Sequence, residues 1–490
     1  MGITNGTVPR PNLLLLPATP WPITYDSIKA AYETPIRHTL RHLKSIIDQG
    51  EKLTNLTIAV HAPFVYSNRK GPRRKLYGPV QELVAGVYTL VCLIAAQDSI
   101  SLEREWGIDA CVVIISWPRT RSEFENPLPT EQGLELIGPV ISLPVFGECN
   151  RLLDHQFEVD VKGNESLKDY RDYLEDYRDI QRVVPQKTVK VPAGEVHLSA
   201  GEHEIAAAGD SNKGIPGQNL RDYYYSIAVG GTFDHLHIGH KLLLTMLAFL
   251  LGPEPPETAL PSDRESAENK QLIIGITGDE LLKKKSNQKL IESWPVRQKA
   301  VWTFLQRIMN FTTTSLRGPT SSDTAMPGPN GYDITETLGP LTLNFAEIRD
   351  PFGPTITNKS ITALVVSAET RKGGHAVTME RVKKGWQALD VYEVDVLSAE
   401  EAVDGEVDEE FKNKLSSTSI RQALADQETT KGETATSEKA GGSAKTQAGS
   451  EARDVETGVT GTKETSKREG LGAATRSQSN DVGAKKAKLS

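Results

Sequence analysis

The chain has 490 residues, a formal net charge of −8, 38% hydrophobic residues and 24% charged residues. This length favours about two to four domains, and the acidic balance argues against general nucleic-acid binding by the whole chain. The three cysteines, Cys92, Cys111 and Cys149, belong to no CxxC or Cys/His cluster. Such a sparse, odd count is typical of a reducing compartment.

The apolar segments near the N-terminus are too short for a leader or a membrane span. Residues 13–16 fall short of the apolar core of a secretory signal peptide. The longer run at 83–96 falls short of the ~20 residues that cross a bilayer. We therefore expect a buried core helix at 83–96, and a cytoplasmic or nuclear protein without membrane or nucleic-acid partners.

Residues 12–158 show the pattern of an α/β domain, which follows a segment at 1–11 that is expected to be disordered. Apolar residues recur at helical spacing between positions 28 and 47. Short apolar runs predict buried strands at 13–16, 56–60 and 111–117. We interpret His61 as a packed or solvated histidine rather than a ligand. No catalytic constellation is evident, so this domain of open role is expected to lie outside any reaction site.

Two further segments carry no signal for a core. Residues 159–222 form a charged connector, in which positions 169–179 favour a solvent-exposed helix. Residues 426–490 contain no aromatic residue and are rich in Thr, Ser, Gly, Lys and Glu. Because such a segment cannot bury enough apolar area to offset its ordering entropy, we predict a disordered tail.

Residues 223–425 alternate expected strands and helices, which predicts an α/β fold with a Rossmann-like, doubly wound parallel sheet. The strands are expected at 225–230, 272–276, 341–348, 363–367 and 391–396. The helices are expected at 238–250, 294–310, 374–386 and 417–425. Two interruptions, at 252–270 and 317–331, are interpreted as surface insertions.

The turn after the first of these strands reads GGTFDHLHIGH, residues 230–240. In a doubly wound sheet, ligands bind beyond the carboxyl ends of the strands, and the free N–H groups that open a helix attract phosphate. Gly231 lets the backbone approach a ligand, and Thr232 adds a hydroxyl. His237 and His240 lie three positions apart on one side of the first helical turn. A zinc site would need a third ligand that the sequence does not show, so we favour a phosphate site.

A second motif, LSSTSIR at 415–421, stands near the end of the expected sheet. Ser417 and Thr418 open a helix, and Arg421 follows one turn later. Hydroxyls at a helix N-terminus together with a guanidinium suit a triphosphate.

These two motifs resemble the signatures of the T/HxGH nucleotidyltransferase superfamily. Together with GITGDELLKKK, IRDPFGPTITN and VVSAETRKGG, they are similar to the eukaryotic phosphopantetheine adenylyltransferases. The resemblance covers residues 223–424 and is much weaker over the first 220 residues. No P-loop for a fused kinase occurs in the sequence, so the resemblance implies the fungal-like, monofunctional type.

The resemblance implies transfer of AMP from ATP to 4′-phosphopantetheine, giving dephospho-coenzyme A and pyrophosphate in coenzyme A biosynthesis, with Mg²⁺ arriving with ATP. His237 and His240 would be catalytic, together with Lys283 or Lys285, between which the sequence does not choose. Substrate contacts are expected from Thr232 and these two lysines. The expected ATP-binding residues are Gly231, Thr232, Phe233, His237, Gly239, His240, Arg371, Ser417, Thr418 and Arg421.

Three alternatives remain open at this stage. The first is a class I aminoacyl-tRNA synthetase, in which the literal HIGH also occurs, although LSSTS does not match the lysine-containing loop of those enzymes. The second is a related cytidylyltransferase-like enzyme that uses CTP and a phospho-alcohol. The third is a non-catalytic scaffold of the coenzyme A pathway, whose other enzymes are candidate partners by analogy.

Overall fold

A computed structural model of the chain shows two sheets within one compact unit, Met1–Lys431. It describes residues 12–50, 54–62, 64–65, 71–102, 107–116, 140–142, 221–253, 261–309, 326–328, 331–338, 341–395, 417–422 and 424–426. The predictions for residues 1–11, for the helix at 169–179 and for the tail beyond residue 426 lie outside this part.

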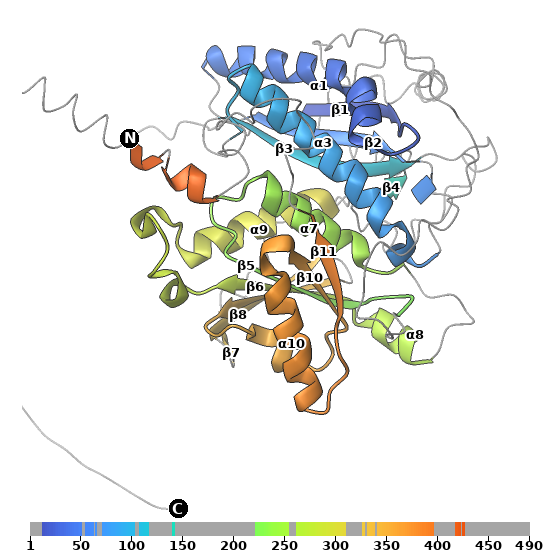
Figure 1. The fold of residues 1–490 in the computed structure, drawn as a ribbon, viewed down its shortest axis with the longest axis vertical. Helices are drawn as coiled ribbons and strands as arrows, with labels where there is room; N and C mark the ends of the chain where they lie inside the picture. Colours follow the sequence, from blue (N-terminus) through green and yellow to red (C-terminus); the bar gives the residue numbers. More distant parts are fainter. Residues whose placement is uncertain are drawn as a thin grey trace, which may run out of the picture. The chain divides into compact units, whose positions relative to one another are not determined.

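The first sheet is parallel, with its strands in the order β1-β2-β3-β4 (Figure 1). Its strands are β1 (Asn12–Ala18), β2 (Thr54–His61), β3 (Ile108–Ser116) and β4 (Val140–Ser142). Its helices are α1 (Tyr25–Asp48) and α3 (Tyr77–Gln97). The three predicted strands and both predicted helices are confirmed, whereas the three-residue β4 was not predicted because it is too short to show a period.

The second sheet has seven strands in the order β11-β10-β5-β6-β9-β8-β7, and five of them are parallel. The strands are β5 (Ser226–Gly231), β6 (Gln271–Thr277), β7 (Met326–Gly328), β8 (Gly331–Leu338), β9 (Leu341–Ile348), β10 (Ala363–Ser367) and β11 (Asp390–Val394). The helices are α7 (Ile238–Leu250), α8 (Pro261–Glu268), α9 (Trp294–Met309) and α10 (Arg371–Lys383). Short 3-10 helices are found at Arg73–Leu76, Asp279–Leu282, Gln288–Leu290, Gly353–Ile356 and Ala368–Thr370.

Both faces of this second sheet are covered. Ile227 and Val229 of β5 belong to the main core with α7 and α9, whereas Ala228 between them packs in a smaller core with Val377 of α10. Strands β6 and β10 alternate in the same way. The α/β class and the mostly parallel sheet are therefore confirmed.

The differences from the predicted elements have local causes. Helix α10 begins at Arg371 rather than at 374, because it directly follows the 3-10 helix Ala368–Thr370, whose start is stabilised by a capping box of Ser367 and Thr370. Gly374 lies inside the helix, where a Cβ would approach Val366 and Val391 at 3.3 Å. The two interruptions also contain regular structure: residues 252–270 include α8, and the segment at 317–331 leads into the antiparallel pair β7 and β8.

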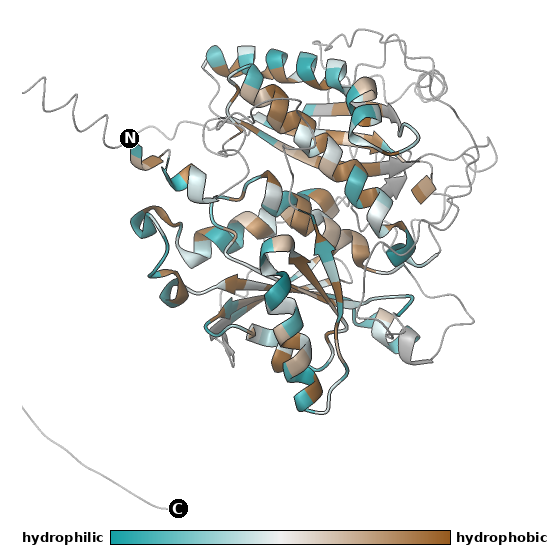
Figure 2. Cartoon of the chain, in the orientation of Figure 1, coloured by the Kyte–Doolittle hydropathy of each residue, from teal (hydrophilic) through white to brown (hydrophobic). Residues whose placement is uncertain are grey.

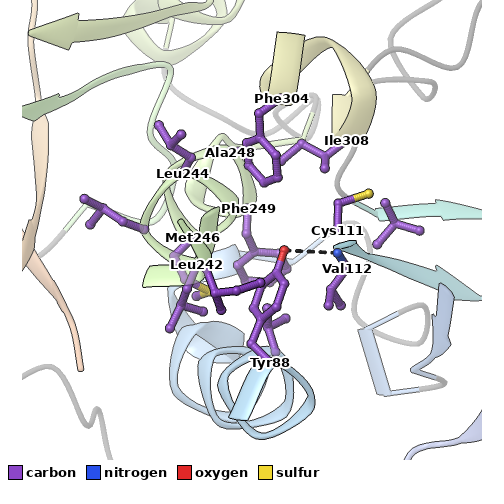
Figure 3. Close-up of a cluster of buried hydrophobic side chains, with 14 of the residues drawn as sticks. Tyr88, Cys111, Val112, Leu242, Leu244, Met246, Ala248, Phe249, Phe304 and Ile308 are labelled. Carbon is purple, nitrogen blue, oxygen red and sulfur yellow. Dashed lines mark hydrogen bonds between the residues drawn. The ribbon is translucent and has the colours of Figure 1, made fainter. Parts of the chain in front are cut away.

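Helix α7 lies between the two sheets, since it packs on α3 and β3 as well as on β5, β10 and β11. Every residue from Lys241 to Leu250 is buried, as expected for a helix without a polar face. Figure 3 shows Leu242, Met246 and Phe249 beside Tyr88 of α3 and Val112 of β3. The Tyr88 hydroxyl accepts a hydrogen bond from the Val112 N–H at 3.1 Å.

Helix α3 is long and apolar enough to cross a bilayer by length and composition, but 83% of the relevant window is buried inside the protein. Figure 2 shows apolar residues along α3 and alternating polar and apolar residues along α1. The prediction of a core helix at 83–96 is confirmed.

Candidate active site

The carboxyl end of β5 lies where the strand order of the second sheet reverses. The neighbours of β5 are β6 on one side and β10 on the other, and the chain passes from β5 through a short turn into α7. Such a switch point opens a crevice between the loops of adjacent parallel strands, where ligands bind in open α/β sheets.

The turn between β5 and α7 is tightly wound. Phe233 and His235 have φ values of 52° and 44°, which L-residues seldom adopt. A Cβ at Gly231 would lie 3.0 Å from the ring of Phe233, so the glycine is needed for the ring to reach the core. Phe233 itself is fully buried, and it is a packing residue in this structure.

The two signature histidines lie together at the start of α7. His237 is the N-cap, and Gly239 lies between the two histidines in the first turn. The ring centroids of His237 and His240 are 3.9 Å apart and the rings are stacked. Their Nδ1 atoms are buried and have no hydrogen-bond partner among the described residues. Because buried polar atoms are normally satisfied, such a pair is typical of a site that is completed by a ligand.

Both imidazoles are neutral at pH 7. Burial lowers the pKa of His240 to about 3, and the positive charge of Lys285 acts in the same direction. Burial also lowers the pKa of His237 well below its usual value, with further contributions from His240, Lys241 and His235. A neutral imidazole donates one N–H and remains a hydrogen-bond acceptor at the other nitrogen.

The structure distinguishes between the two candidate lysines. Lys285 donates to the Thr232 hydroxyl at 3.0 Å, so its ammonium group lies at the β5–α7 turn. Burial lowers the pKa of Lys285 below its usual value, and the charge of Arg421 adds to this effect. Lys283 instead bonds Glu280 at 2.5 Å on the surface. The site therefore contains Lys285, while Lys283 is paired elsewhere.

The second motif is held against the first by a buried ion pair. Residues 417–422 are helical, and the Arg421 guanidinium bonds the Asp234 carboxylate at 2.5 Å. The side chains of Arg421 and Asp234 are 1% and 0% exposed. Ser417 donates to the Asp234 carbonyl at 2.8 Å, and Thr418 accepts from Arg421 at 3.2 Å. The sequence predicted that Arg421 binds ATP, whereas in this structure its guanidinium binds the Asp234 carboxylate.

A further arginine, which the sequence did not single out, holds the floor of the site. Arg297 of α9 is 0% exposed and donates to the carbonyls of Thr232 and Thr277, both at 2.8 Å. It also bonds Asp279 at 2.7 Å. These contacts tie the ends of β5 and β6 together. No local motif marks this residue, because its partners lie far from it in sequence.

The hydrogen bonds of Arg371 join it to β11 rather than to the β5–α7 turn that carries the histidines. It begins α10 and forms an exposed two-fold ion pair with Glu393 of β11. The adjacent Glu369 acts on the pKa of Lys285 through its charge, so the β10–α10 turn borders the site. An ATP contact by Arg371 stays a prediction.

The donors at this site suit anions better than a metal ion. Within the described ranges, no group of three or more His, Cys, Asp or Glu residues could hold a metal. The Asp234 carboxylate is already paired with Arg421. Two imidazoles, one ammonium group and one hydroxyl instead match the oxygens of phosphate groups.

Comparisons with known proteins give one family match and several relatives. Residues 4–197 match a family described as "Domain of unknown function (DUF8446)". An uncharacterized protein of Schizosaccharomyces pombe is 35% identical over 198 residues, which is 40% of this chain and 48% of that protein. A protein of unknown function from Archaeoglobus fulgidus shares 20% identity over 35% of this chain and 98% of its own, with a TM-score of 0.22, and supports no argument.

The other relatives are enzymes by name. The phosphopantetheine adenylyltransferase of Saccharomyces cerevisiae is 32% identical over 49% of this chain and 61% of its own length. That of Thermococcus kodakarensis is 28% identical over 42% of this chain and 90% of its own. The chain spans about half to three fifths of the two fungal relatives that it matches. It is a distant homologue of the phosphopantetheine adenylyltransferases.

Proposed function

We propose that the protein transfers AMP from ATP to 4′-phosphopantetheine, with release of pyrophosphate. The observation that supports this best is the stacked pair His237 and His240, whose Nδ1 atoms have no hydrogen-bond partner among the described residues, beside Lys285 at the switch point of the sheet. The distant homology to phosphopantetheine adenylyltransferases agrees with a nucleotidyltransferase.

The residue types suit this reaction because its nucleophile is a phosphate oxygen that is already anionic at pH 7. No general base is required, and neutral histidines do not hinder the attack. The protein has to hold two polyanions in line and stabilise charge that develops at the α-phosphate. In the proposed arrangement, His240 donates to the α-phosphate, while His237 and Thr232 hold neighbouring oxygens.

The remaining site residues divide into contacts and supports. Lys285 would bridge the two substrates, since it already reaches Thr232. Ser417 and Thr418 would face the β- and γ-phosphates, and Arg421 would keep them in place through Asp234. Mg²⁺ bound with the ATP phosphates would neutralise part of the leaving-group charge.

The test is an assay of the purified full chain with ATP and 4′-phosphopantetheine, which measures pyrophosphate and identifies dephospho-coenzyme A by mass. Parallel reactions with CTP, and with choline phosphate or ethanolamine phosphate as acceptor, distinguish a cytidylyltransferase. If no combination of nucleotide and acceptor releases pyrophosphate, the proposal is overturned and a non-catalytic scaffold is favoured.

His240→Ala tests the central assignment. Loss of one preorganised donor raises the barrier by about 2.7–4 kcal/mol, so kcat should fall about 10²- to 10³-fold. Binding of ATP should change little, because the donor acts mainly on the transition state. Turnover close to that of the unaltered protein would refute the role of His240.

A further inference from the structure

The first sheet contacts the helix that carries the HxGH motif. The contact is made by the side chain that directly follows the motif in sequence. Lys241, in the first turn of α7, forms an ion pair with Asp109 of β3 and donates to the Ala110 carbonyl at 2.9 Å. The Lys241 side chain is only 5% exposed. A lysine is seldom buried unless it is paired, so this contact fixes both the position and the rotation of the helix start.

Asp109 forms ion pairs with two basic side chains, Lys241 and Arg307. Its second carboxylate oxygen accepts from Arg307 of α9 at 3.1 Å, and Arg307 also bonds the Asp109 carbonyl at 3.1 Å. Helix α9 provides Arg297, which holds the Thr232 carbonyl. One carboxylate of the first sheet therefore binds both helices on which the site of the second sheet is built.

The opposite end of α7 is held by the first domain as well. Arg73 donates to the Phe249 carbonyl at 3.4 Å and lies over the Phe249 ring. Between these two ends, α7 packs on Tyr88, Cys111 and Val112 (Figure 3). The first domain thus contacts α7 at both of its ends and along the length between them.

We propose that Asp109 is a positioning residue for the transfer site, and that the first α/β domain braces α7 so that His237 and His240 stay in register with Lys285. This inference rests on the proposed function for its kinetic part. It keeps the expectation that the first domain lies outside the reaction site, and it gives that domain a role in holding the site together. Without that domain, α7 would expose an apolar face and Lys241 would lose its partner.

The experiment compares three variants of the full chain. Asp109→Asn removes the carboxylate charge and keeps the shape. Lys241→Met removes the other charge, and it leaves Asp109 paired with Arg307, so it should fold even if the first variant does not. Leu14→Ala, in the distant strand β1, is the matched control, because it weakens the first sheet without touching α7.

Two readouts are needed. The first is kcat and KM for ATP, where the Asp109 and Lys241 variants should lose about tenfold or more in kcat with KM within about threefold. Their effects should be less than additive in the double variant, because both variants disrupt the contact between Lys241 and Asp109. The second is hydrogen exchange of α7, which should speed up in both variants while α10 stays unchanged.

The outcomes separate this inference from the proposed function. If the unaltered protein shows no transfer, the exchange of α7 still tests the brace. Faster exchange at α7 confined to the Asp109 and Lys241 variants supports it. Unchanged exchange and unchanged kcat in Lys241→Met overturn it, and so does an equal loss of kcat in Leu14→Ala, which would show a general loss of stability.

Discussion

Breaking the ion pair between Arg421 and Asp234 should release the second motif from the first. In Arg421→Met, the Asp234 carboxylate, which is 0% exposed, loses its guanidinium partner and keeps the hydrogen bond from the Glu292 N–H at 2.9 Å. Removing one partner of a buried pair typically costs about 3–5 kcal/mol. Because residues 417–422 join the rest of the site through side-chain hydrogen bonds, we expect the cost to appear as local opening rather than as full unfolding.

The magnitude can be measured by hydrogen exchange. At about 1.36 kcal/mol per factor of ten, protection of residues 417–422 should fall by about 10²-fold to about 5 × 10³-fold. Arg371→Met is the matched control, because its pair with Glu393 lies on the surface and such pairs contribute little. The double variant Arg421→Met with Asp234→Asn should recover most of the protection, since Asn still accepts from Glu292. Equal changes in the Arg421 and Arg371 variants would refute the reasoning.

Four further predictions concern the two lysines, the pH dependence of activity, the pH dependence of stability, and the tail. Lys285→Ala should lower kcat at least about 10²-fold, whereas Lys283→Ala should stay within about threefold in the same pyrophosphate assay. Because the pKa of Lys285 is lowered from 10.5, activity should decline on the alkaline side before an ordinary lysine titrates, and Lys285→Arg should remove this limb of the pH profile. Burial lowers the pKa of His61 to about 3, so the unfolded chain binds more protons between about pH 6.5 and 3. The free energy of unfolding should therefore fall as the pH falls through that window. The difference between its values at pH 7.5 and 5, measured by urea titration, should be smaller in His61→Gln than in the unaltered protein. Deletion of residues 430–490 should leave kcat within about twofold, and a folded but inactive truncated protein would show that the tail has a role.

The sequence predicted the parts of the fold that depend on local periodicity. Strands β9 and β10 and helix α7 have the predicted bounds, because continuous apolar runs with clear breakers specify them. The β7–β8 hairpin escaped prediction, because Gly and Pro around it read as loop.

The candidate site was predictable where a motif is contiguous, and not where a contact joins distant positions. His237, His240 and Thr232 follow from one short stretch, and the structure brings them together with Lys285. The partnership of Arg421 with Asp234 spans 187 positions, and that of Arg297 with Thr232 spans 65. One usable signal was overlooked: a thirteen-residue helix with no polar face needs cover on both sides, and the second sheet supplies only one.

The sharing of α7 between two sheets has a consequence for the chain during its synthesis. Strand β3 ends at Ser116 and α7 begins at Ile238, so the ribosome adds about 120 residues before the helix that covers α3 and β3 exists. At about 5–20 residues per second, the apolar surface of the newly synthesised first sheet stays uncovered by α7 for roughly 6–24 s. During that interval the nascent chain exposes an apolar surface that is prone to aggregation. We therefore expect binding by a chaperone to matter most during this part of synthesis.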